Sequence, residues 1–182
     1  VFRALFRHPT VPFVGSIGVF SSDVADYLIE YFQLHREMSK NVTWQGLFAQ
    51  ACRWHIHLRR QKTYDQLRAR VGVESWEPIS PMSTMYLNGW RYRELNSIDD
   101  IVQESIYFKH CLASSYTERI VDHEYVAFHM QHLQETHLSL TLGCHFQYGR
   151  LVYDQVRLQN NLIPDHTIIA AAQAFVDEFN DY

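Results

Sequence analysis

The chain has 182 residues, of which 47% are hydrophobic and 14% aromatic, and it holds only 7 glycines and 5 prolines. This length fits one ordinary domain or two small ones, and the composition excludes a disordered, collagen-like or low-complexity chain. The net charge of −4 argues against a general nucleic-acid binder.

The charge is distributed unevenly along the chain. Residues 1–93 hold 12 Lys/Arg and 7 Asp/Glu, a net charge of +5, whereas residues 94–182 hold 4 Lys/Arg and 13 Asp/Glu, a net charge of −9. We therefore expect a basic helical region over residues 1–93 and an acidic α+β region over residues 94–182, either as two parts or as one continuous domain.

The cysteines and the apolar segments indicate the compartment. Cys52, Cys111 and Cys144 are odd in number and widely spaced, which favours reduced thiols in a cytoplasmic protein. No apolar run reaches the roughly 18–20 residues that cross a bilayer. Residues 1–20 are interrupted by prolines and lack a small-residue cleavage site, so we expect neither a membrane span nor a signal peptide.

Two helices are predicted in the basic region. Residues 21–39 carry an apolar stripe behind Ser22 as the cap. Residues 44–71 follow Thr43, a second cap, and Gly72 offers a stop. The last turns before Gly72 are either an extension of this helix or a separate short one.

The middle of the chain is predicted to be a connector followed by two helices. Residues 74–96 are rich in turn-forming and aromatic residues and read as a surface connector. Ser97 starts a Ser-x-x-Asp capping pattern for a helix over residues 98–108, and residues 110–122 have the periodicity of another helix.

The period of the apolar residues changes near residue 124. Runs over residues 125–132, 137–146 and 150–158, joined by short turns, predict an antiparallel meander. A terminal helix follows Pro164 and Asp165. The predicted fold is therefore α+β, with N-terminal helices, a three-stranded antiparallel meander and a C-terminal helix, the helices covering one face of the sheet.

Histidines adjacent to cysteines raise two chemical interpretations. A zinc site is disfavoured because adjacent residues on a helix or strand point in different directions, and no metal or cofactor is predicted. Cys111 is a candidate nucleophile. His110 diverges from it on a helix, so the base would come from the sheet, from His129, His137 or His145. The alternative is that Cys111 packs as a small apolar residue beneath the sheet.

A basic cluster lies on the second predicted helix. Cations along one helix face with an aromatic side chain near them are typical of phosphate and base contact. The alternatives are a solvated helix face and a surface that docks on the acidic half of this chain or of another chain. The candidate nucleic-acid-binding residues are Arg53, Trp54, His57, Arg59, Arg60, Lys62 and Arg68.

A second group of polar residues falls where helix and sheet are expected to meet. Tyr116, Glu118 and Arg119 follow His110 by a helical turn or so. The last predicted strand ends in Gln155, Arg157, Asn160 and Asn161. Such a junction is a usual place for a site, although polar residues that end a strand also serve as turn formers.

These motifs resemble the PcfJ-like family of conjugative plasmids and other mobile elements. The resemblance covers roughly residues 93–180 and rests on Leu95-x-Ser97, Gln103-Glu104-Ser105, His110-Cys111-Leu112-Ala113-Ser114-Ser115-Tyr116 and Arg119-Ile120. It implies a mobile-element context and no established reaction. His110, Cys111, Tyr116, Gln155 and Asn161 carry over as motif positions and are the candidate catalytic residues.

Several positions depart from the family pattern. Ser105 and Leu158 stand where the family has glycine, and Gly143 stands where it tends to have an acidic residue. These departures are typical of a divergent copy.

Three functions are compatible with these features. The first is a mobile-element-associated accessory protein that binds nucleic acid or an acidic protein surface through the basic helix. The second is an enzyme acting on nucleic acid or nucleotides, which requires His110, Cys111, Tyr116 and Gln155 to meet in one pocket. The third is a structural subunit of a larger assembly. The charge pattern favours the first and third, with a partner subunit and no membrane.

Overall fold

The computed structural model describes residues 17–34, 37–39 and 41–181, with the side chains from residue 22 onward. The expectation of no signal peptide concerns residues outside this part of the chain. None of the described helices combines the length and the hydropathy needed to cross a membrane. The chain forms two compact units, residues 1–61 and 62–182, and the predicted boundary at 93/94 falls inside a strand of the second unit.

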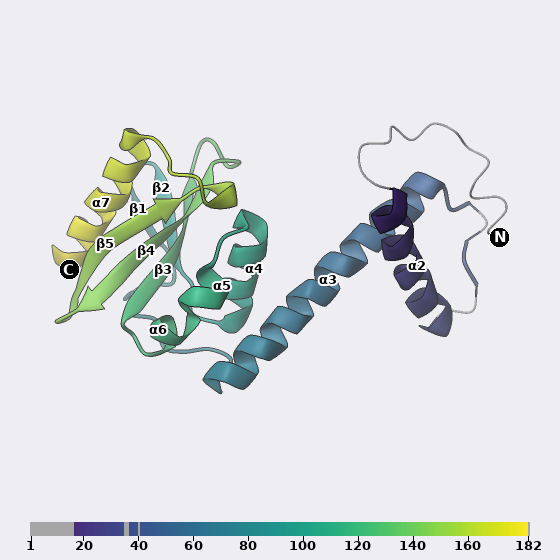
Figure 1. Cartoon of the computed structure of the whole chain (residues 1–182). Coiled ribbons are helices and arrows are strands. Elements are labelled where there is room, and N and C mark those ends of the chain that lie inside the picture. Colours follow the sequence, from purple (N-terminus) through teal and green to yellow (C-terminus); the bar gives the residue numbers. More distant parts are fainter. Residues whose placement is uncertain (1–16, 35–36, 40, 182) are drawn as a thin grey trace. The chain divides into compact units, whose positions relative to one another are not determined.

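The first unit holds helix α2 (Ile17–Leu34) and the beginning of helix α3 (Trp44–Val71) (Figure 1). Among the described residues of this unit, Val24, Leu28, Leu47 and Ala51 form a buried cluster. Thr43 caps α3 as predicted, since its hydroxyl accepts the N–H of Gly46 at 3.1 Å.

Helix α3 is continuous over 28 residues, which decides between the two readings of its last turns. It ends at Gly72, whose φ of +75° is the left-handed conformation that suits glycine at a helix C-terminus. Helix α2 begins before the predicted residue 21 and ends before residue 39.

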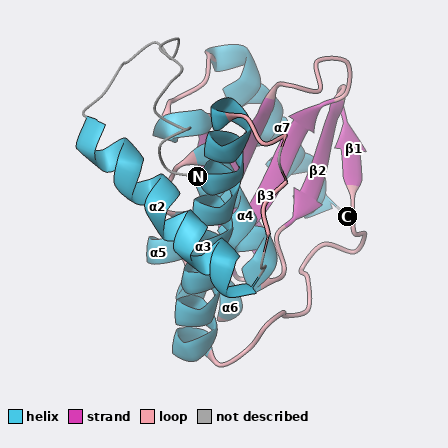
Figure 2. Ribbon diagram, turned by 90° about the vertical axis from the view of Figure 1, so that its right-hand side faces the viewer, coloured by secondary structure: helices cyan, strands magenta, loops and turns pink. Residues whose placement is uncertain are grey.

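The second unit is built on a five-stranded antiparallel sheet in the order β1-β2-β3-β4-β5. Figure 2 shows β1, β2 and β3 side by side. The bounds are β1 Met85–Leu87, β2 Trp90–Glu94, β3 Tyr125–His132, β4 Ser139–Gln147 and β5 Arg150–Arg157. The prediction of three strands is wrong in number, although the three predicted strands are present.

The two missed strands come from the segment predicted to be a connector. Asn88 and Gly89 have φ values of 48° and 82°, which are the positive angles of a tight hairpin turn. Trp90 and Tyr92 then alternate into the core, so residues that read as aromatic turn formers pair as β1 and β2.

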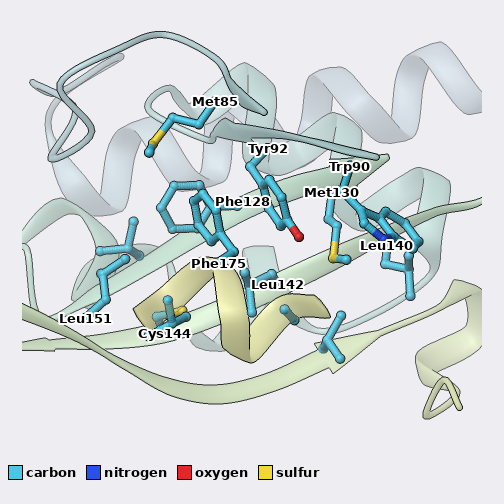
Figure 3. Packing of buried hydrophobic residues seen from close by; sticks show 14 of the residues in the cluster. Met85, Trp90, Tyr92, Phe128, Met130, Leu140, Leu142, Cys144, Leu151 and Phe175 are labelled. Carbon is cyan, nitrogen blue, oxygen red and sulfur yellow. The ribbon is translucent and has the colours of Figure 1, made fainter. Parts of the chain in front are cut away.

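Helices cover both faces of the sheet rather than one face, which corrects the sequence-based expectation (Figure 1). Helix α7 (His166–Asp181) lies on one face, where Phe175 stacks on Tyr92 with ring centroids 3.8 Å apart (Figure 3). Helices α4 (Ile98–Phe108), α5 (Leu112–Ser115) and α6 (Thr117–Val121) lie on the other. The alternation of apolar and polar residues in β4 agrees with this arrangement, because its apolar residues Leu140, Leu142 and Cys144 face α7.

The predicted helix over residues 110–122 is instead a turn followed by two short helices. Helix α4 ends at Lys109 in the left-handed conformation, with φ 53° and ψ 50°. His110 and Cys111 therefore lie in the turn before α5, and Tyr116 separates α5 from α6 with a φ of −121°. The Ser105 hydroxyl accepts the N–H of Ala113 at 2.8 Å and fixes α5 against α4.

Candidate functional site

A partly open cavity of about 30 Å3 lies between the α4–α5 turn and the face of β4 and β5 that carries polar side chains. This volume holds one or two water molecules. Its lining comes from the turn, α5, the strands β3 to β5 and the short helix η1 (Gln159–Asn161). The lining residues are His110, Cys111, Leu112, Tyr116, Tyr125, Thr141, Gly143, Gln155, Arg157 and Asn161.

All five candidate catalytic residues therefore line one cavity, although they come from three separate stretches of the sequence. His110 and Cys111 come from the turn, and Tyr116 from the junction of α5 and α6. Gln155 lies on β5 and Asn161 in η1. These residues share the lining of one cavity, and their catalytic role stays a prediction.

A chain of hydrogen bonds holds the ring of His110. Its Nε2 lies 2.8 Å from Oγ1 of Thr141, and this hydroxyl donates to Oε1 of Glu104 at 2.7 Å. Glu104 is buried and its other oxygen lies 2.9 Å from Nδ1 of His129. The carboxylate of α4 thus fixes, through one hydroxyl of β4, the orientation of the imidazole.

This pattern assigns the tautomer of His110. Thr141 gives its own proton to Glu104, so it accepts from a protonated Nε2 of His110. Nδ1 of His110 accepts the backbone N–H of Leu112 at 3.4 Å, which agrees with a lone pair on that nitrogen. Burial lowers the pKa of His110, against the opposing charge of Glu104, and so favours the neutral ring that can accept a proton.

Cys111 is exposed at the cavity, so the interpretation that it packs beneath the sheet is wrong. His110 and Cys111 lie in a turn and not on the predicted helix, so the expectation that their side chains diverge along a helix does not apply. The three histidines proposed instead do not line the cavity. His129 bonds to Glu104, His137 is exposed, and His145 lies 3.0 Å from a guanidinium nitrogen of Arg119.

The opposite wall is a network around Gln155. Its amide nitrogen lies 3.0 Å from the hydroxyl of Tyr116 and 3.3 Å from that of Tyr125. Tyr125 donates to Asp154 at 2.8 Å, and Nε of Arg157 donates to Oε1 of Gln155 at 3.0 Å. The amide of Gln155 thus orients both a phenol and a guanidinium at the cavity.

Gly143 makes room for Tyr125 beneath this network. A Cβ on Gly143 would lie 2.0 Å from the hydroxyl oxygen of Tyr125, which no side chain tolerates. The sheet also bulges here: Gly143 pairs with Gln155 and Cys144 with Tyr153, so Asp154 is an extra residue. Burial raises the pKa of Tyr125, so its hydroxyl stays protonated and acts as a hydrogen-bonding group.

Asn161 reaches the cavity from η1. Asn160 and Asn161 have φ values of 59° and 62°, a conformation that asparagine adopts more readily than most residues. Gln159 donates to the carbonyl of Tyr107 at 3.0 Å and so ties η1 to the end of α4.

Sequence analysis missed several residues of this site. Glu104 was named only as part of the Gln103-Glu104-Ser105 motif. Thr141 and Tyr125 were not predicted to belong to a site. The alternation of β4 was a usable signal, because it placed Thr141 and Gly143 on the polar face, opposite the apolar core residues. Nothing local in the sequence indicates that Glu104 bonds to Thr141, 37 residues away.

The predicted nucleic-acid-binding residues lie along α3, outside this cavity. Arg53, His57, Arg59, Lys62 and Arg68 are exposed, and Arg60 is partly buried. Trp54 contacts the ring of Tyr27 at 5.9 Å and that of His55 at 4.7 Å, so it is part of the helix packing. Arg68 is paired with Glu74 at 2.8 Å. Nucleic-acid binding by this helix stays a prediction.

Among the described residues, no group of three His, Cys, Asp or Glu side chains is placed to hold a metal ion. No family model matches the chain, and neither a curated protein nor a solved structure gives a significant match. The resemblance to the PcfJ-like family and the mobile-element context therefore stay predictions, and the function is argued from the cavity.

Proposed function

We propose that this protein is an enzyme with a thiol nucleophile, and that the cavity is its active site. One observation carries the proposal: the cavity gathers Cys111 with His110, whose second ring nitrogen is fixed through Thr141 to Glu104. A nucleophile next to a base that a third group orients is the arrangement that thiol enzymes use.

Each group has a role in this proposal. The lone pair on Nδ1 of His110 leaves its long hydrogen bond from the backbone N–H of Leu112 and accepts the thiol proton as the sulfur of Cys111 attacks an acyl or phosphoryl centre. The new bond to sulfur forms as the bond to the leaving oxygen or nitrogen breaks, and His110 returns the proton to that leaving group. Water then hydrolyses the covalent intermediate. Thr141 and Glu104 are positioning residues.

The size of the cavity constrains how the substrate binds. About 30 Å3 admits the reacting group alone, so the rest of the substrate lies outside the opening. Nucleotides and nucleic acids are candidate substrates, because their reacting phosphoryl groups are small compared with the whole molecule. Tyr116 and Asn161 line the cavity as polar residues for binding that group, and Gln155 holds the hydroxyl of Tyr116 in place.

The test is the rate at which iodoacetamide alkylates Cys111, followed by peptide mass mapping. An ordinary thiol, with a pKa near 8.5, is only a few per cent thiolate at neutral pH. We expect His110→Gln to slow the alkylation of Cys111 about tenfold at neutral pH, and Thr141→Val to slow it less. His137→Gln is the matched control, because His137 is exposed in the β3–β4 turn and does not line the cavity. Equal rates in His110→Gln and the unmodified protein would contradict the proposal.

A further inference from the structure

Arg157 combines two features: it lines the cavity and it has no carboxylate partner among the described residues. It is the last residue of β5 and lines the cavity in a half-buried position. Arg70 pairs with Glu118 at 3.2 Å and Arg93 with Asp100 at 2.6 Å. Within the part of the chain that the structure describes, no carboxylate lies within ion-pair distance of Arg157.

The guanidinium of Arg157 is nevertheless held in place. Its Nε donates to Oε1 of Gln155, which leaves the terminal nitrogens for a ligand. Arg157 is also the direct cross-strand partner of Thr141, so both side chains lie on the same face of the sheet. Thr141 binds His110, and the fixed cation therefore lies on the same sheet face as the base.

The carboxylates nearest the cavity are already engaged. Glu104 accepts from Thr141 and contacts His129. Asp154 accepts from Tyr125 and lies 3.0 Å from the amide nitrogen of Gln155. A half-buried guanidinium without a carboxylate partner, in a chain half of net charge −9, leaves a local positive charge that a ligand can neutralise.

Other donors point to the same class of ligand. The hydroxyl of Tyr116 accepts from Gln155, so its own proton is available to a ligand. Asn161 is a further polar residue in the lining of the same cavity. Fixed N–H and O–H donors beside a guanidinium match the oxygens of a carboxylate or a phosphate.

We propose that Arg157 binds an oxyanion, a carboxylate or phosphate group of the substrate, next to Cys111. This inference rests on the proposed function, because it gives the charge class of the substrate on which the thiol acts. The volume of about 30 Å3 restricts the bound part to the oxyanion itself.

The test compares two alkylating agents of nearly equal size, anionic iodoacetate and neutral iodoacetamide, on Cys111 of the full chain. We expect Arg157→Gln to lower the ratio of the iodoacetate rate to the iodoacetamide rate roughly five- to tenfold. Arg150→Gln is the matched control, because Arg150 is exposed at the opposite end of the same strand, and it leaves the ratio unchanged. Arg157→Lys keeps the positive charge but lacks the planar guanidinium group. Its ratio of rates is expected to fall between that of Arg157→Gln and that of the unmodified protein.

Competition identifies the source of the oxyanion. Inorganic phosphate and acetate, added separately at constant ionic strength, slow the iodoacetate reaction of the unmodified protein, and the stronger competitor gives the class. Neither is expected to protect Arg157→Gln. The competition is measured on the unmodified protein. It therefore tests the oxyanion site even where Arg157→Gln does not fold.

The outcomes separate the two proposals. An unchanged ratio in folded Arg157→Gln, or no competition by either anion, would overturn the oxyanion site while the dependence on His110 still supports the thiol enzyme. A ratio that depends on Arg157, together with alkylation that is indifferent to His110, would support the oxyanion site and overturn the proposed enzyme.

Discussion

Among single residues, His110 links the site to the stability of the fold. Burial lowers its pKa from the usual value of about 6.5, even though Glu104 opposes this shift. A lowered pKa means that the unfolded chain binds the proton more readily than the folded chain. His110 therefore costs no stability above pH of about 6.5, and it destabilises the fold as the pH falls below that value.

This gives a prediction for His110→Gln. Between pH of about 7.5 and 5.5, the free energy of unfolding of the variant should fall less than that of the unmodified protein, because glutamine does not titrate. Urea unfolding at both pH values measures the difference. His137→Gln, which replaces an exposed histidine in the β3–β4 turn, is the control and should follow the unmodified protein. Parallel losses in His110→Gln and the unmodified protein would contradict the burial argument.

Within elements, the end of α4 determines where the thiol and the imidazole lie. Lys109 occupies the left-handed conformation, and its N–H bonds to the carbonyl of Ser105. This one residue stops the helix and turns the chain so that His110 and Cys111 face the cavity instead of continuing along α4.

A lysine in this conformation costs roughly 1 kcal/mol more than a glycine. Lys109→Gly should therefore raise the free energy of unfolding by about 0.5–1 kcal/mol, measured by urea denaturation. Lys109→Ala keeps the Cβ and should bring no such gain. A glycine variant no more stable than the alanine variant would contradict the cost assigned to the left-handed conformation, and an equal loss of stability in both variants would show that contacts of the lysine side chain hold the turn.

The same elements show what the sequence could and could not predict. Periodicity found α4, α7 and three strands, because each buries apolar residues at a regular spacing. Helix α3 was predicted with the help of its Thr43 cap and its Gly72 stop, since its buried residues are just Leu47, Ala51 and Leu67. The β1–β2 hairpin was not predicted, because strands of three and five residues are too short to show the two-residue period of a strand. Asn88-Gly89 is nevertheless a hairpin signal. The turn at residues 109–111, which separates α4 from α5, was not predicted because lysine is not a residue that usually adopts the left-handed conformation.

The site was predictable only in part. The motif positions His110, Cys111, Tyr116, Gln155 and Asn161 were selected by a resemblance, and their convergence depends on pairing between β4 and β5. The partners that give them chemistry, Thr141 and Arg157, are direct neighbours across two strands, 16 residues apart in the chain. Such neighbours follow from strand register, which local patterns leave open.

In the whole molecule, the cavity and all its partners lie within residues 62–182. This unit has two hydrophobic clusters, one on each face of the sheet, and every buried residue in them lies within the same range. The end of α3 belongs to it: Leu67 is buried, and Arg70 donates to the carbonyl of Ala113 at 3.2 Å. The basic stretch centred on Arg53 and Arg59 belongs instead to the first unit.

We therefore expect residues 62–182 alone to unfold cooperatively and to keep the reactivity of Cys111. Because both clusters and the His110 hydrogen bonds are retained, the rate of alkylation by iodoacetamide should stay within about twofold of the rate in the full chain. A version beginning at residue 73 is the control. It lacks Leu67 and Arg70, so it should be less stable by about 2 kcal/mol or more in urea. A loss of cooperative unfolding or of Cys111 reactivity in residues 62–182 would show that the basic unit is needed to complete the fold or the site.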